Sequence, residues 1–413
     1  MRRAVEQVAR LDAVRRSTPL PALRRFALSD AGNAEYFAAL YGRDSRFDHK
    51  RQQWLFWRGG QWQLDRDGER YRLAKQAMRA RLKDAANQED ENRRRAEVAH
   101  SLASESRGRL EALLALARSE RPIADAGDGW DSDPWLLGVQ NGIVDLRTGE
   151  LRAATRDDRI SLRASVSYQP DAKSDLWDGA LRAILPDDQV RAFVQKAIGY
   201  SASGDTRCDV WFLLEGSGRN GKGILIQPIR RALGDYALEL PASVLDTRVD
   251  RAYELAKLPG LRFVTSSEVG DTIRLNHDRL KQLTGGDAMS ASGKYQHAIE
   301  FVPVGKLWLS CNRLPTATDD SPAFWARVRR IPFQVSFAGR EDQTLRPRLT
   351  HEPRTRRPSS RGLFMGLCAT SRKDSATRLQ PCGRHGGVSR RLRCTQRVPV
   401  GGVRACARLG GWT

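Results

Sequence analysis

The order of hydrophobic and polar positions predicts a small sheet in the first part of the chain. Over residues 26–64 the pattern passes from helix-like spacing to strand-like alternation, and RFDHKRQQWLFWRGGQWQLD has the form of a β-hairpin. Trp54 and Phe56 share one face of its first strand, Gly59-Gly60 supplies the turn, and Trp62 returns on the partner strand. These aromatic side chains can stack on nucleic-acid bases, but packing inside a small sheet is the interpretation that we favour.

The next segments predict long helices and a second hairpin. Residues 69–118 are rich in Ala, Leu, Arg, Lys and Glu with few helix breakers, which indicates two or more charged amphipathic helices. The segment PWLLGVQNGIVDLRTGELR then predicts a hairpin with Asn141-Gly142 as its two-residue turn and Thr148-Gly149 as a second reversal. Helical spacing returns at residues 175–200.

A glycine-rich loop follows the short apolar run at residues 209–214. The loop reads EGSGRNGKG, and the helical pattern ILIQPIRRALG comes directly after it. Gly216 and Gly221 permit backbone conformations that turn several N–H groups toward one anion, and Lys222 can reach the terminal phosphates of a nucleotide. The phosphate-binding signature G-x-x-x-x-G-K ends with Ser or Thr, but this chain has Gly223 there, which offers no hydroxyl to a magnesium ion. The loop favours nucleotide binding over a chance glycine-rich turn.

From about residue 26 to residue 345 the order of segments resembles the phage and plasmid primase-helicase family, a branch of superfamily 3 that includes poxvirus primase-helicases. Loops in that family read G-x-G-x-N-G-K followed by Ser, Thr or sometimes Gly. The resemblance implies a P-loop, AAA+-like superfamily 3 ATPase core with a parallel sheet, an α/β fold, and ATP and Mg²⁺ as cofactors. It also implies that the nucleotide-binding residues are Gly216, Gly218, Asn220, Gly221, Lys222 and Gly223.

The same resemblance gives roles to two strand ends. LRFVTSSEVGD looks like the second core strand, and Glu268 beyond it would hold the Mg²⁺ hydration shell or polarise the attacking water. Many family members have two adjacent acids here, whereas this chain has Ser267 before Glu268, so one carboxylate would serve both roles. Asn312, after the strand KLWLSC, corresponds to the polar sensor of the γ-phosphate, and Arg313 would assist.

A hairpin specific to superfamily 3 should follow in DRLKQLTGGDAMSASGKYQHAIEF. Lys281 and the Gly-Gly-Asp turn at residues 285–287 match the family motif. Lys294 and Tyr295 at the hairpin tip would point into the channel of a ring and follow a single DNA strand by phosphate contact and stacking. A plain surface hairpin is the alternative.

Arginines in DDSPAFWARVRRIPF resemble the arginine finger of ring ATPases. Arg327 is the first candidate and Arg330 the second, whereas Arg329 is expected to lie on another face or to bind a carboxylate locally. Such a finger acts on the nucleotide of the neighbouring subunit, so the resemblance implies a homo-hexamer whose monomer hydrolyses ATP poorly.

The net charge of +21 is unevenly distributed. Residues 350–413 contain 14 Lys and Arg residues against Glu352 and Asp374, so +12 of the charge lies there. The remaining +9 fits a phosphate-bearing partner and solvated helix faces equally well. Four of the six cysteines also lie in this last segment, and no C-x-x-C pair indicates a metal site. We interpret the segment as a frameshifted or degenerate translation, with a disordered basic tail as the alternative.

These patterns together predict four parts of the chain. They are a basic leader (1–25), an α+β helicase-associated domain (26–175), a superfamily 3 helicase ATPase domain (176–345) and the basic tail (346–413). No primase catalytic domain is expected, so priming would need a separate primase. No run of about 18 apolar residues is present, so no membrane contact is expected, and a cytoplasmic location in a bacterium or a phage-infected host follows.

The expected function is that of an ATP-dependent DNA helicase or translocase of phage, prophage or plasmid replication. Its partners would be single-stranded DNA and replication-fork DNA. The alternative is a truncated, inactive prophage remnant that binds nucleotide or DNA without motor activity. An unrelated P-loop kinase or loader ATPase is disfavoured by the Asn-terminated strand and the late arginines.

Overall fold

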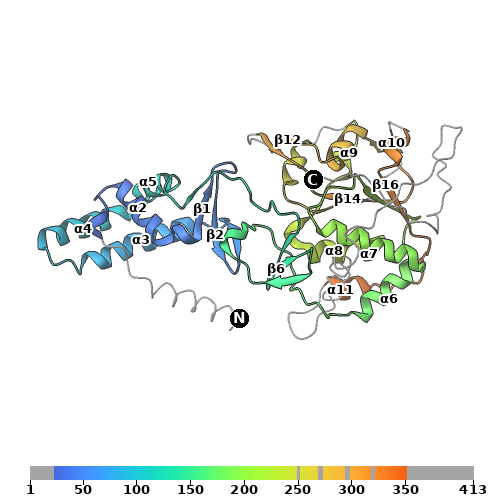
Figure 1. Ribbon diagram of the computed structural model, residues 1–413, viewed down its shortest axis with the longest axis horizontal. Helices are drawn as coiled ribbons and strands as arrows, with labels where there is room; N and C mark the ends of the chain where they lie inside the picture. The colour runs from blue at the N-terminus through green and yellow to red at the C-terminus, as the bar shows by residue number, and fades with distance from the viewer. Residues whose placement is uncertain (1–22, 249–251, 268–272, 294–297, 318–320, 351–413) are drawn as a thin grey trace, which may run out of the picture. The chain divides into compact units, whose positions relative to one another are not determined.

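The computed structural model describes residues 23–248, 252–267, 273–293, 298–317 and 321–350. The chain is mixed α/β and divides into two compact units, Met1–Trp130 and Asp131–Thr413 (Figure 1). Most of the expected leader and tail lies outside the described ranges. Short 3₁₀ helices occur in both units: η1 (Leu23–Arg25), η2 (Gly42–Asp44), η3 (Arg156–Asp158), η4 (Gly234–Tyr236), η5 (Ala242–Leu245) and η6 (Ala252–Lys257).

The first unit is α+β, as the sequence predicts. Its helices are α2 (Asp30–Tyr41), α3 (Glu69–Ala85), α4 (Glu91–Ser104) and α5 (Arg107–Ala117). Its sheet has the order β3-β2-β1-β4, with β1 (Ser45–Asp48), β2 (Gln53–Arg58), β3 (Gln61–Leu64) and β4 (Ala124–Asp125). The β2–β3 hairpin is confirmed, and its turn glycines, Gly59 and Gly60, both have positive φ. Trp54, Phe56 and Trp62 are buried, so these aromatic side chains pack in the core and are not available to stack on bases.

A buried polar network joins three helices of this unit. Arg81 of α3 donates from Nε to Glu97 Oε2 of α4 over 3.0 Å, and from Nη1 to Asn33 Oδ1 of α2 over 2.9 Å. Asn33 Nδ2 in turn donates to Ser104 Oγ over 2.9 Å. Because Arg81 and Glu97 are both almost completely buried, their ion pair offsets the cost of removing two charges from water.

The second unit begins with a three-stranded sheet of β5 (Leu136–Val139), β6 (Gly142–Asp145) and β7 (Glu150–Arg152). The predicted hairpin is present, but Val139 pairs with Gly142, so Gln140 and Asn141 form the two-residue turn, one position earlier than expected. Asn141 is held there because its side chain exchanges two 2.9 Å hydrogen bonds with the backbone of Tyr168.

A five-stranded parallel sheet forms the centre of the second unit. Its strands are β8 (Trp211–Glu215), β9 (Ala237–Glu239), β10 (Phe263–Ser266), β14 (Lys306–Cys311) and β16 (Val328–Pro332). They lie in the order β16-β8-β14-β10-β9, and every neighbouring pair is parallel. Their carboxyl ends therefore meet at one edge, with β8 between β14 and β16.

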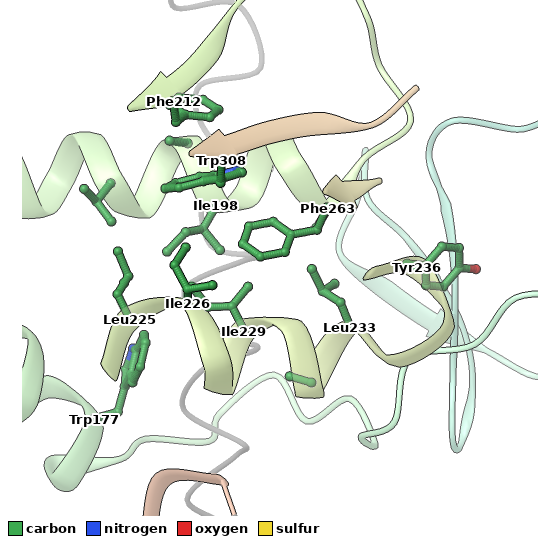
Figure 2. Close-up of a cluster of buried hydrophobic side chains, with 14 of the residues drawn as sticks. Trp177, Ile198, Phe212, Leu225, Ile226, Ile229, Leu233, Tyr236, Phe263 and Trp308 are labelled. Carbon is green, nitrogen blue, oxygen red and sulfur yellow. The ribbon is translucent and has the colours of Figure 1, made fainter. Parts of the chain in front are cut away.

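Successive residues of a strand face opposite sides of the sheet, so both sides of this sheet present apolar side chains and are covered. The core on one side contains Phe212, Phe263 and Trp308, and that on the other contains residues such as Trp211 and Leu213. Figure 2 shows the first core, where apolar residues of α8 (Lys222–Leu233) point toward the rings on the sheet. The same core includes residues of α6 (Asp175–Ile184) and α7 (Asp188–Ala202).

The boundary between the units does not coincide with the one expected at residues 175 and 176. Residues 131–175 belong to the second unit, where the buried Arg262 guanidinium donates to the backbone oxygens of Asp133 and Leu136. The expected boundary at residues 345 and 346 also falls inside a helix. Helix α11 (Leu345–Thr350) spans that boundary and buries Leu349 in the core beside α8.

The remaining elements lie between residues 274 and 325. They are β11 (Arg274–Leu275), α9 (His277–Thr284), β12 (Met289–Ser292), β13 (Ala298–Phe301), β15 (Thr316–Ala317) and α10 (Pro322–Trp325). Strands β12 and β13 form the antiparallel hairpin that the sequence predicts. Across the described ranges, every helix is too short or too polar to cross a membrane.

Candidate functional site

The glycine-rich loop connects the carboxyl end of β8 to α8, at the centre of the parallel sheet. Glu215, the last residue of β8, lies in register with Cys311, the last residue of β14. The Gly216 amide donates to the Cys311 carbonyl over 3.3 Å, so the loop starts directly beside the end of β14. Ligands of open α/β sheets bind at this edge, outside the carboxyl ends of the strands.

Three glycines are required by the shape of the loop. Gly218 and Gly221 have φ values of +99° and +86°, which residues with a Cβ rarely adopt. A Cβ on Gly216 would lie 1.7 Å from Nδ2 of Asn220. The Asn220 side chain is buried and donates to the Phe333 carbonyl over 3.3 Å. Asn220 therefore fixes the loop from inside, and its side chain does not face a ligand.

The amino end of α8 has no side-chain cap among the described residues. Gly221 is its N-cap and supplies no side-chain hydrogen bond, and the first turn contains no acidic residue. The first amides of a helix lack partners within the helix, and the helix dipole places partial positive charge there. This end of α8 is thus suited to bind an anion.

Lys222 joins the loop to β14. Its Nζ donates to the Gly216 carbonyl over 2.7 Å and to Asn312 Oδ1 over 3.0 Å. Both acceptors are neutral, and partial burial lowers the pKa of the Lys222 ammonium. The structure thus brings together the lysine and the asparagine that the sequence selects, and Asn312 itself is exposed.

Arg330 lies at the same edge but is held by its own chain. Its Nε forms an ion pair with Glu215 at the end of β8. The pairing follows from the sheet order, since β16 lies directly beside β8. An arginine engaged in this way is poorly placed to act on the nucleotide of a neighbouring subunit.

Arg327 lies at the opposite edge of the sheet. It immediately precedes β16, and its backbone oxygen accepts from the Trp211 amide at the start of β8. Its guanidinium hydrogen-bonds Thr284 Oγ1 over 3.2 Å and pairs with Asp209 over 3.4 Å. Since five strand residues extend over roughly 16 Å, Arg327 cannot reach a phosphate at the loop of its own chain.

Glu268, Lys294 and Tyr295 lie outside the described residues. The strand that leads to Glu268 is β10, which ends at Ser266, in register with Leu309 of β14. The Ser266 hydroxyl is buried and has no hydrogen-bond partner within the described part of the chain. The carboxyl end of β10 is therefore next to the strand that carries Asn312.

The described residues alone do not form a metal cage. Among them, no three His, Cys, Asp or Glu side chains come together as metal ligands, and Gly223 has no hydroxyl to offer. A site with so few protein ligands still fits Mg²⁺ that is bound together with a nucleotide. Mg²⁺ commonly takes one or two protein carboxylates and completes its shell with phosphate oxygens and water.

The sequence interpretation missed the segment that follows β16. The Phe333 amide donates to the Glu215 carbonyl over 2.8 Å, and the Phe337 amide donates to the Arg219 carbonyl over 2.9 Å. Glu341 pairs with the Arg219 guanidinium over 3.2 Å. Residues 333–341 thus lie along the glycine-rich loop. The only sequence signal was the pair of aromatic residues after the strand.

Two family models match the chain. Residues 34–186 match the model described as D5 N terminal like, and residues 214–330 match a family of unknown function (DUF5906). The second match covers the glycine-rich loop from its start and ends at Arg330.

Curated relatives come from large DNA viruses. The chain is 31% identical over 222 residues to "Putative helicase L207/L206" of Acanthamoeba polyphaga mimivirus, covering 52% of this chain and 23% of that protein. It is 30% identical over 230 residues to "Putative helicase 121R" of Invertebrate iridescent virus 3, covering 52% and 24%. With "Putative primase C962R" of African swine fever virus it shares 24% identity over 223 residues, covering 51% and 23%. The chain thus spans about a quarter of the length of these relatives.

Among solved structures, the NrS-1 C terminal region matches with a TM-score of 0.47 and 12% identity, covering 78% of this chain and 65% of that one. The two family models and the viral relatives confirm the resemblance that the order of motifs predicts. The chain carries a D5 N terminal like region followed by a region of the DUF5906 family, and its viral relatives are named as putative helicases and primases, which is consistent with the primase-helicase resemblance.

Proposed function

We propose that the second unit is an ATP-hydrolysing P-loop core of the superfamily 3 type. The observation that carries the proposal is the pair of hydrogen bonds from Lys222 to Gly216 and Asn312, made at the carboxyl edge of the sheet beside the uncapped end of α8. A lysine, a polar strand end and free helix amides in one place are the parts that bind and polarise a triphosphate.

Each part has a distinct task in this proposal. The loop amides and α8 bind the β- and γ-phosphates, and the Lys222 ammonium exchanges its two neutral acceptors for phosphate oxygens. Asn312, once released from Lys222, orients the water that attacks the γ-phosphate. Glu268, following β10, polarises that water and holds the hydration shell of Mg²⁺. The metal supplies charge neutralisation on the phosphates.

A second subunit completes the site in this proposal. Arg327 lies at the edge of the sheet opposite to its own loop, so it can serve only a nucleotide bound to another copy of the chain. This placement supports a ring, with a homo-hexamer as the form that the resemblance implies. Arg327 must leave Asp209 and Thr284 to reach that nucleotide.

The substrate of the motor is DNA. The β12–β13 hairpin is present, and it leads to the expected tip residues Lys294 and Tyr295. The names of the viral relatives favour a role in replication. We therefore propose ATP-driven movement along single-stranded DNA and unwinding at a replication fork.

The test compares ATP hydrolysis by the full chain and by Lys222→Ala, with and without single-stranded DNA. We expect stimulation by DNA and a loss of roughly 100-fold or more in the variant, because a preorganised charge at the phosphates is removed. Lys257→Ala is the matched control, since Lys257 is an exposed lysine paired with Glu254. Equal rates for the wild type and Lys222→Ala would refute the proposal.

The second candidate is a remnant that binds nucleotide without motor activity. It is favoured by one observation, namely that Arg327 and Arg330 are both engaged within their own chain. Light scattering in the presence of ATP and Mg²⁺ separates the two candidates. A monomer that binds ATP without DNA-stimulated hydrolysis would support the remnant, whereas a ring with stimulated hydrolysis would exclude it.

A further inference from the structure

Helix α11 brings an arginine to the glycine-rich loop. The helix packs against α8, and its Leu349 is buried in the core that includes Leu225 and Ile226 of α8. A Cβ placed on Gly223 would lie 2.9 Å from Nη2 of Arg346 and 3.6 Å from its Cζ. The Arg346 guanidinium therefore lies directly over the residue that follows Lys222.

No acidic group is committed to this guanidinium within the described residues. Glu341 pairs with Arg219, and Asp342 accepts from the hydroxyl and amide of Thr344. Arg346 is exposed, and its side chain makes no ion pair or hydrogen bond in the described ranges. Within the described residues, a lysine, a guanidinium and an uncapped helix end thus place positive charge at one spot, and the nearby Glu215 carboxylate is already paired with Arg330.

We propose that Arg346 binds the phosphate chain of the nucleotide held by its own glycine-rich loop. The inference rests on the proposed nucleotide site and adds a residue that lies beyond both matched family regions. A guanidinium presents several donors in a plane and binds phosphate oxygens in pairs, which a lysine does not do. Gly223 is compatible with this role, because it leaves the space beside the guanidinium unfilled.

The test measures the Kd of the full chain for ATP, ADP and AMP by calorimetry, with Mg²⁺ and with EDTA. We expect Arg346→Ala to weaken ATP binding roughly 10- to 100-fold, as the loss of a charge-assisted hydrogen bond does. The Kd of Arg346→Lys for ATP should lie between those of the wild type and Arg346→Ala, since lysine keeps the charge but not the paired donors. Arg348→Ala, which removes an exposed arginine from the same helix, should bind ATP like the wild type.

Two further readouts separate phosphate binding from a purely structural role. The loss in Arg346→Ala should be largest for ATP and smallest for AMP, and the Tm without nucleotide should match that of the wild type. Equal losses for all three nucleotides, or a lowered Tm without nucleotide, would overturn the inference.

The failure of this inference is distinguishable from the failure of the proposed function. If the wild type does not bind ATP, or if Lys222→Ala binds it equally well, the nucleotide site itself is wrong and the inference falls with it. If Lys222→Ala loses binding while Arg346→Ala binds like the wild type, the site stands and only the role of Arg346 is refuted.

Discussion

The contact between Gly216 and Asn220 leads to a quantitative prediction for the loop. In Asn220→Ala the Phe333 carbonyl loses its buried donor. This loss should lower the free energy needed to open the loop and the adjoining β8 and α8 by roughly 1–3 kcal/mol. In Gly216→Ala the new Cβ would stand 1.7 Å from Asn220 Nδ2, so the Asn220 side chain has to leave and the same hydrogen bond is lost. The Cβ also approaches the Phe333 oxygen to 2.8 Å, which adds a cost that moving Asn220 does not relieve.

The two substitutions should therefore be strongly non-additive. Asn220→Ala is expected to cost roughly 1–3 kcal/mol in the wild type and close to zero in the Gly216→Ala background, because the bond is already broken there. Because the chain has two compact units, the opening free energy should be followed by hydrogen exchange of the amides in β8 and α8. Each single variant should also bind ATP more weakly, since both deform the loop.

Gly179→Ala is the matched control for adding a methyl group. Gly179 lies in α6, and a Cβ there would meet no atom within 4 Å. This variant should leave the loop unchanged and stabilise α6 by about 0.5–1 kcal/mol. If Asn220→Ala cost the same in the wild type and in Gly216→Ala, the explanation of Gly216 by its contact with Asn220 would be wrong.

Three other predictions concern separate parts of the chain. Burial lowers the pKa of Lys306 to about 7, whereas the pKa of a lysine in an unfolded chain is about 10.4. Between about pH 7 and pH 10 the unfolded state therefore binds more protons than the folded state. Stability should then rise by about 2 kcal/mol from pH 7 to pH 9, and urea unfolding of Lys306→Met should lack this rise; an identical rise would contradict the assignment. Glu97→Gln should destabilise the first unit by about 3–5 kcal/mol, because the buried Arg81 keeps its charge without a carboxylate; an unchanged Tm would argue against it. Arg327→Ala should bind ATP but not hydrolyse it, and mixing it with Lys222→Ala should restore part of the activity; no recovery in mixed oligomers would exclude action between subunits.

Local patterns were sufficient to predict much of the fold. Gly59 and Gly60 identified the first hairpin because a tight turn needs positive φ, and Trp54 and Phe56 are buried on one face of its first strand as expected, although Leu55 on the other face is buried too. The apolar runs that became β8, β10 and β14 were recognisable because strands covered on both faces are almost continuously hydrophobic. The loop was recognised from its position between such a strand and an amphipathic helix.

Nonlocal contacts account for what the sequence did not predict. The engagement of Arg330 with Glu215 depends on β16 lying beside β8, and no spacing along the chain reports that neighbour. Arg262 precedes an apolar strand and resembles a solvated end residue, yet it is buried and ties residues 131–175 to the second unit. Residues such as Leu137, Val144 and Tyr168 also pack in the core of the second unit, so the unit boundary depends on nonlocal contacts that spacing along the chain does not report.

The glycine-rich loop is not a self-contained motif in this chain. Its inner hydrogen bond ends on the Phe333 carbonyl, its Arg219 backbone binds the Phe337 amide, and its open side faces Arg346. All three residues lie after Arg330, where the matched family region ends. The shape and the charge of the loop thus depend on a segment that comes more than a hundred residues later in the chain. A comparison restricted to the glycine-rich signature would find the lysine but would miss the residues that hold it in place.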